Sequence, residues 1–244
     1  MSKLILILLT VFVVLNACNT KKDFEINGYR FVNEYAEIDE ITIDQLTGSI
    51  TLDFLINLNS YPTTWTSIAY KFESDKKNEF NLRIKDKNEA QWYFGNGEKA
   101  FILEWSPKDL LPLNKWVRIT AVRDVENQYM ALYVDGVLKV HKYYNELTKA
   151  DQTNSKIILM GRIETNQFLN ATISSFRIWS KSLTSDDLTK STMRIGKPHK
   201  NKNIIVYYDF NNIENSTVRD LSGSHRDLKI IRRGQLKNNA NETN

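Results

Sequence analysis

The stretch YMALYV-DG-VLKVH, residues 129–141, decides the fold. Two apolar segments rich in aromatic and β-branched residues flank Asp135-Gly136, a pair that favours the positive φ angles of a two-residue hairpin turn. We assign the wholly apolar face of this hairpin to the core and the other face to solvent, which leaves His141 outward. The expected pairs are Tyr133 with Leu138 and Ala131 with Val140 on the core face, and Leu132 with Lys139 and Met130 with His141 on the other.

Other segments repeat with the same period of two, which is typical of strands in an antiparallel sheet. They are residues 49–56, 80–84, 116–122 and 172–178. One short helix is expected from Thr184, because the Thr184 side chain can cap the first turn and the Asp187 side chain can bond back to the Thr184 backbone. The pattern predicts an all-β antiparallel sandwich with one short helix.

Several segments, taken together, resemble the LamG-like jelly-roll domains of the concanavalin A-like lectin/glucanase sandwich. The resemblance spans about 150 residues in the family's order and implies a two-sheet jelly roll over residues 24–232. Such sandwiches host glycan-binding modules, protein-binding modules and glycosidases. The segments are Thr47–Ile56, Asn114–Ile119 followed by Leu132–Gly136, Ile158–Arg162, and Ile173–Thr184. Leu55, Arg118 and Ser174-Ser175 depart from the family's usual Trp, His and acidic pair.

One segment stands out of order. Residues 205–210 with 220–223 resemble the hairpin that opens the family's domains, yet here they come last. We therefore expect this segment to return to the sandwich beside residues 31–38, as in a domain permuted by one hairpin, and to bring Asp23 near Ile231.

The first residues resemble a bacterial lipoprotein signal. A basic start precedes the apolar run 4–15, which is shorter than the roughly 20 residues of a membrane span. Leu15-Asn16-Ala17-Cys18 resembles the lipobox, which implies cleavage after residue 17 and lipidation of Cys18. Residues 18–23 would then tether the domain to the outer membrane of a Gram-negative bacterium, while residues 233–244 form a flexible tail.

Composition excludes several function classes. Cys18 is the only cysteine, so lipidation would leave no thiol for a disulfide, metal site or nucleophile. Removing residues 1–17 leaves 32 basic and 29 acidic side chains, interspersed along the chain, which is no nucleic-acid footprint. No cofactor motif is present, and no pattern fixes ligands for calcium, so Asp75, Asp86 and Asp124 are interpreted as turn residues.

We expect no enzyme, because the chain lacks a complete catalytic pattern. Glu37 and Asp39 share a strand face, but Ile41 and Ile43 follow on that face where the family's glycosidases place a second glutamate. A non-catalytic binding module is the better interpretation, with polysaccharide or a surface protein as partner. A divergent glycosidase and a purely structural role are the remaining alternatives.

A sugar site needs aromatic faces with polar rims. The aromatic residues least explained by a strand core lie in polar segments near proline or glycine. They are Tyr61, Trp65, Trp92, Tyr93 and Trp105. Two or more of them exposed on one rim would favour glycan binding.

Overall fold

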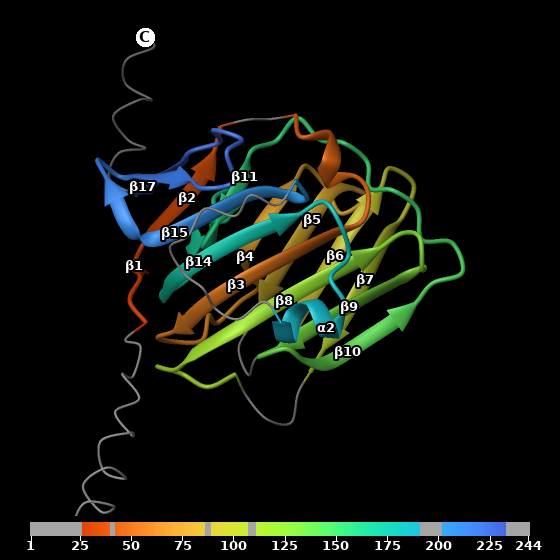
Figure 1. Ribbon diagram of the computed structural model, residues 1–244, viewed down its shortest axis with the longest axis horizontal. Coiled ribbons are helices and arrows are strands. Elements are labelled where there is room, and N and C mark those ends of the chain that lie inside the picture. The colour runs from red at the N-terminus through yellow and green to blue at the C-terminus, as the bar shows by residue number, and fades with distance from the viewer. Residues whose placement is uncertain (1–25, 40–41, 86–88, 107–110, 191–201, 233–244) are drawn as a thin grey trace, which may run out of the picture.

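The computed structural model describes residues 26–39, 42–85, 89–106, 111–190 and 202–232 (Figure 1). The expected signal peptide 1–17, Cys18 with its tether, Asp23, Asp86 and the tail 233–244 lie outside these ranges. No helix within them is long and apolar enough to cross a bilayer.

The described chain is built almost entirely of strands. Two short helices accompany them, the 3-10 turn η1 (Asp44–Leu46) and α2 (Ser185–Lys190). The strands are β1 Tyr29–Phe31, β2 Glu34–Ile38, β3 Ile50–Leu58, β4 Thr66–Phe72, β5 Lys77–Ile84, β6 Ala90–Asn96, β7 Ala100–Trp105, β8 Trp116–Asp124, β9 Tyr129–Val134, β10 Val137–Tyr143, β11 Ile157–Leu159, β12 Gly161–Arg162, β13 Gln167–Phe168, β14 Ala171–Trp179, β15 Ile204–Glu214, β16 Thr217–Asp220 and β17 Leu228–Arg232.

The strands form two layers joined along one side. The front layer runs β10-β9-β8-β3-β14-β15, and the back layer runs β17-β2-β11-β4-β5-β6-β7, with β16 linking them (Figure 1). All pairs of named strands in the described ranges are antiparallel. This is the predicted antiparallel jelly-roll sandwich.

The core lies between the layers because one side of each strand carries large apolar residues. Phe54 of β3 stacks on Phe176 of β14 with ring centroids 4.4 Å apart, and both are fully buried. From the back layer, Phe80 and Trp92 face the same interior. Interdigitated aromatic rings of this kind contribute strongly to burial and to a single packing arrangement.

The β9–β10 hairpin forms at Asp135-Gly136 as predicted, but its face assignment was wrong. Tyr133 pairs with Leu138 as expected, whereas a bulge at Lys139 shifts the rest, so that Val140 pairs with Leu132. Met130 and Leu132 face the main core, whereas Ala131 and Tyr133 are buried on the opposite face in the cluster that includes Leu188 of helix α2. His141 is exposed, as expected.

The last three strands close the sandwich. β15 pairs with β14, β16 with β15, and β17 with both β16 and β2. Ile231 lies opposite Tyr35, which confirms that the terminal segment returns beside residues 31–38.

Helix α2 packs on the outer face of the front layer. The Thr184 hydroxyl accepts a hydrogen bond from the Asp187 amide at 3.2 Å, and the Asp187 carboxylate accepts one from the Thr184 amide at 3.1 Å. This confirms the predicted cap. Leu188 is buried against an apolar cluster on that face, so the helix is held by its one large apolar residue.

Candidate functional site

Two of the five predicted aromatic ligand residues are buried, and we correct the prediction for them. Trp92 is fully buried between the layers, where its indole N–H donates to the Val122 carbonyl at 3.0 Å. Tyr93 is 1% exposed, and its hydroxyl accepts a hydrogen bond from Asn81 at 2.9 Å. Both rings are removed from solvent, so neither can stack on a sugar.

The other three, Tyr61, Trp65 and Trp105, lie at one end of the back layer and are half-buried. The Tyr61 hydroxyl donates to the Leu111 carbonyl at 2.6 Å, and Trp105 packs against the core. The guanidinium of Arg83 sits 4.9 Å from the centre of the Trp65 ring. None of the three is fully exposed, so the described structure does not show the exposed aromatic cluster that the sequence predicted.

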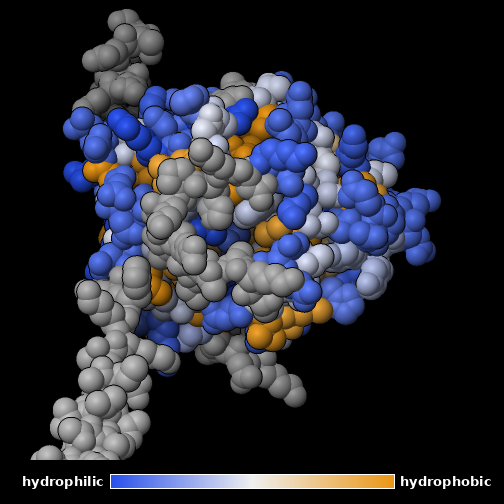
Figure 2. Space-filling view, in the orientation of Figure 1, coloured by the Kyte–Doolittle hydropathy of each residue, from blue (hydrophilic) through white to orange (hydrophobic). Residues whose placement is uncertain are grey.

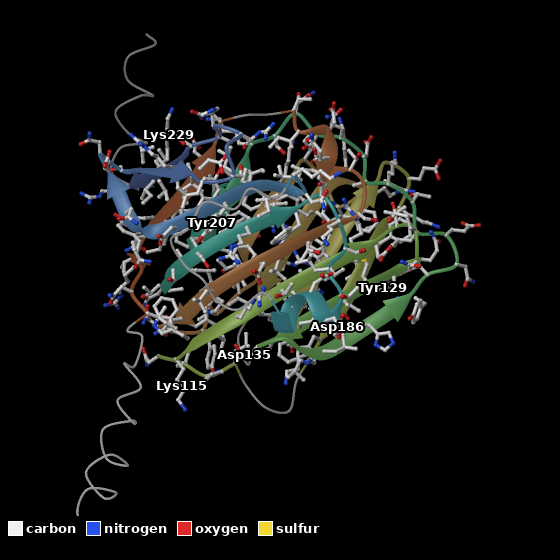
Figure 3. All side chains as sticks on the ribbon, viewed as in Figure 1. Lys115, Tyr129, Asp135, Asp186, Tyr207 and Lys229 are labelled. Atoms are coloured by element: carbon white, nitrogen blue, oxygen red, sulfur yellow. The ribbon has the colours of Figure 1, made fainter. Side chains whose placement is uncertain are left out.

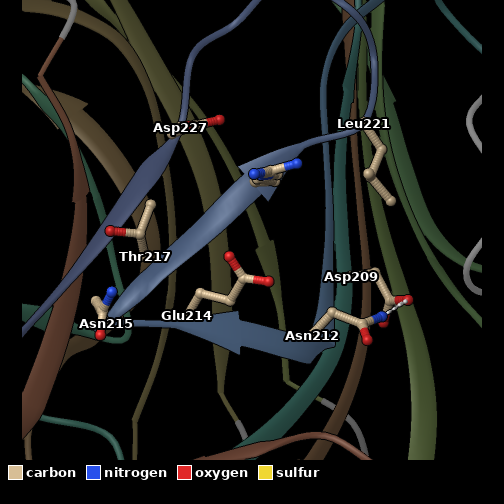
Figure 4. A pocket seen from close by; sticks show the side chains of 8 residues that line it. Asp209, Asn212, Glu214, Asn215, Thr217, Leu221 and Asp227 are labelled. Carbon is tan, nitrogen blue, oxygen red and sulfur yellow. Dashed lines mark hydrogen bonds between the residues drawn. The ribbon is translucent and has the colours of Figure 1, made fainter.

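A polar groove of about 500 Å³ lies where β15 leaves the front layer to join β16 (Figure 4). The sequence analysis did not identify it. Its lining combines acids, amides, a hydroxyl, a guanidinium and one apolar side chain. These residues are Asp209, Asn212, Glu214, Asn215, Thr217, Arg219, Leu221 and Asp227.

The groove exists because β15 changes partner along its length. Its first half pairs with β14 up to Asp209, whereas its end pairs with β16 at Ile213 and Glu214. Between these segments the register with β16 shifts, so the strand pair opens. Asn215 and Ser216 close the hairpin with φ angles of 50° and 60°, the left-handed values that a two-residue turn of this type requires.

Asp209 forms a fixed polar wall of the groove. The residue is 4% exposed, and its carboxylate accepts hydrogen bonds from the backbone and side-chain nitrogens of Asn211 at 3.1 and 2.6 Å. The Asn212 side chain donates a third at 3.2 Å (Figure 4). An Asn-Asn pair is typical of a loop, but Asn211 and Asn212 lie within β15. The one sequence signal for this site was Asp209, an acidic residue that follows an apolar strand segment and precedes the two asparagines.

The groove's other charged groups are open to solvent. Glu214, Arg219 and Asp227 are exposed, and within the described chain neither Glu214 nor Arg219 forms an ion pair. In the same ranges, no group of three or more His, Cys, Asp or Glu residues is arranged to hold a metal ion. The groove therefore offers acceptors and donors for hydroxyl, amide or amine groups.

The acid pair considered for glycosidase chemistry is held in ion pairs. Glu37 and Asp39 do share a face, since Lys156 Nζ contacts their carboxylates at 2.8 and 2.7 Å. Lys229 also contacts Asp39, at 2.5 Å. The hydrogen bond from Lys156, followed by that from Lys229, lowers the pKa of Asp39 to about 2. An acid this strong cannot protonate a leaving group near neutral pH.

Among solved structures, this chain is similar to a candidate carbohydrate-binding protein from Bacteroides ovatus, with 17% identity and a TM-score of 0.63. That match covers 83% of this chain and 58% of the other, so the chain spans little more than half of that protein. The sialidase CBM40 of Ruminococcus gnavus, solved with α2,3-sialyllactose, matches with 16% identity and a TM-score of 0.54. The match covers 68% of this chain and 96% of that module. At these identities the likeness shows the fold.

Comparison with curated protein sequences gives no match. The family model described as the concanavalin A-like lectin/glucanases superfamily matches residues 31–189, which is well over half of the chain. The match ends before β15–β17, so the groove lies outside the matched residues. The chain belongs to the concanavalin A-like lectin/glucanase superfamily.

Proposed function

We propose that this protein is a non-catalytic glycan-binding module that takes its ligand in the polar groove at β15–β16. The groove itself is the observation that carries this proposal. It has the volume of a small-ligand site and presents carboxylate, amide, hydroxyl and guanidinium groups together. Sugar hydroxyls pair with such groups as both donors and acceptors. The fold's likeness to carbohydrate-binding structures supports the same conclusion.

The absence of catalysis is part of the proposal. It is supported by the ion pairs of Glu37 and Asp39 with Lys156, and by the low pKa of Asp39, which leaves Asp39 unable to serve as a general acid near neutral pH. In the groove, Asp209 is held by three hydrogen bonds from asparagines and has the role of a positioned acceptor.

The proposal is tested by a glycan array followed by titration calorimetry on the best hits. Asn212→Ala and Glu214→Gln should each weaken binding by about five- to tenfold, because a hydrogen bond to a charged or amide partner contributes roughly 1–1.5 kcal/mol. Glu98→Gln is the matched control, since it removes the same charge from an exposed turn far along the chain. Failure to bind across a broad array would favour the alternative of a protein-binding module.

We further propose that Cys18 carries a lipid anchor that holds the protein at the outer membrane. The apolar leader and Leu15-Asn16-Ala17-Cys18 support this. Two or more acyl chains give stable membrane attachment. In a detergent phase-separation assay, the native chain should enter the detergent phase and a Cys18→Ser variant the aqueous phase. A variant that still enters the detergent phase completely would refute the anchor.

A further inference from the structure

The groove carries an excess of negative charge. Asp209, Glu214 and Asp227 contribute three carboxylates to its lining, and Arg219 contributes the one guanidinium. Glu214 is the last residue of β15, and Asp227 directly precedes β17. In Figure 4 the two flank the same space, with Asp209 on a third side. A ligand in the groove therefore lies between carboxylates, whichever strand it contacts.

Two arginines of the front layer and Lys229 are paired with acids outside the groove. On the outer face of the front layer, Arg118 contacts Asp53 at 2.7 Å and Arg177 contacts the same carboxylate at 3.9 Å. Both arginines are buried, and Arg177 also lies 4.5 Å from the centre of the ring of Tyr207. Tyr207, on β15, is labelled in Figure 3. Lys229 is paired with Asp39. These three cations contact acids outside the groove, and Arg219 is the cation among the groove's lining residues.

The buried acid retains capacity for a ligand. A carboxylate has about four acceptor positions, and Asp209 uses three of them for Asn211 and Asn212. The remaining position can accept a hydrogen bond from a hydroxyl or an ammonium group. An ionised carboxylate has no proton to donate to a second carboxylate. Because Asp209 is largely removed from water, its charge would also repel an anionic ligand placed beside it.

We infer that the groove selects neutral or amine-bearing glycans and rejects acidic ones, an inference that rests on the proposed glycan-binding function. Unpaired like charge at a site discriminates against a ligand more sharply than a missing contact does. The likeness to a module solved with a sialylated sugar concerns the fold, whereas the charges of this groove oppose a sialic acid carboxylate.

The test compares ligands that differ mainly in charge. Lactose and α2,3-sialyllactose form one pair, and chitotriose and its deacetylated, amine-bearing form are the other, within an array of neutral, amine-bearing and acidic glycans. Neutral hits should bind at least about tenfold more tightly than their acidic counterparts, equivalent to about 1.4 kcal/mol. Amine-bearing hits should weaken as salt is raised from 50 to 500 mM, since screening reduces attraction to carboxylates.

Variants separate this inference from the proposed function. The double variant Glu214→Gln/Asp227→Asn should narrow the difference between neutral and acidic glycans to less than about threefold, whereas Glu98→Gln should leave it unchanged. Equal or tighter binding of the acidic member of a pair would overturn the charge selection while leaving glycan binding intact. No binding by any glycan of the array would overturn both.

Discussion

At the scale of single residues, the most demanding group is Arg123, whose guanidinium lies entirely within the protein. Its nitrogens donate to the carbonyls of Gly48 at 2.9 Å and Glu79 at 2.6 Å, and also to that of Leu46. The Phe94 ring covers it at 4.4 Å. Burial lowers the pKa of Arg123 to about 9, which still keeps it protonated at neutral pH.

Replacing Arg123 with Met should therefore strongly lower the free energy of unfolding. Three buried carbonyl groups would lose their donors, and removal of one partner from a buried charged network typically costs about 3–5 kcal/mol. The measurement is the urea midpoint at unchanged m value. Arg219→Met, at an exposed position, should change the free energy of unfolding by under about 0.5 kcal/mol. A similar effect of the two substitutions would contradict the role assigned to Arg123.

Asp39 should give a specific acid dependence of stability. Its pKa is about 2 in the folded chain and about 3.9 when unfolded, so its contribution is present above pH 4 and is lost as the pH falls towards 2. Because its side chain is 49% exposed, the contribution is small. Between pH 2.5 and 6, the free energy of unfolding measured with urea should change less steeply with pH for Asp39→Asn than for the native chain. Asp75→Asn, an exposed turn position, is the control, and identical slopes for the two variants would exclude the effect.

At the scale of elements, β10 ends the front layer and leaves an edge exposed. Val137, Leu138 and Tyr143 are 57%, 44% and 68% exposed, and Figure 2 shows an apolar patch at the lower edge where β10 lies. Two features protect the edge from pairing with another chain. These are the bulge beside Lys139 and the charges of Lys139 and Lys142.

Replacing Lys139 and Lys142 with Val should convert this edge into a site of self-association. The double variant should elute as dimers or larger species whose fraction rises with concentration in light-scattering chromatography. Lys76→Val with Lys115→Val removes the same charge from exposed positions outside β10. A double β10 variant that stays monomeric at high concentration would show that the bulge alone protects the edge.

At the scale of the whole molecule, the terminal strands hold the two layers together. β15 buries Val206, Tyr208 and Phe210 in the core, and β17 covers the edge of β2. Deleting residues 203–231 would expose the edges of β14 and β2 along with that apolar surface. We expect the truncated chain to lose its cooperative thermal transition, measured by calorimetry and near-UV circular dichroism. A truncated protein that still melts cooperatively would refute this role.

The sequence predicted the layered fold well because period-two alternation and Asp135-Gly136 are local signals. The sequence-based prediction was wrong where the outcome depends on which strands lie next to each other. The bulge at Lys139 and the burial of both faces of β9 depend on neighbouring strands, as does the burial of Trp92. The groove was missed for the same reason, since it arises from a register shift between Tyr208 and Ile213 that no local pattern announces.

β2, near the start of the described chain, pairs with β17 at its end, and we expect this pairing to form late in folding. Glu34 in β2 lies opposite Arg232 in β17, and Lys229 contacts Asp39 across 190 residues of chain. Contacts this distant in sequence form slowly, because closing a long loop costs conformational entropy before the contacts can stabilise the fold. During synthesis β2 must wait, with its edge on the β17 side open, until nearly the whole described chain has been made. We therefore expect the chain to be most prone to aggregation before β17 has been made and has paired with β2.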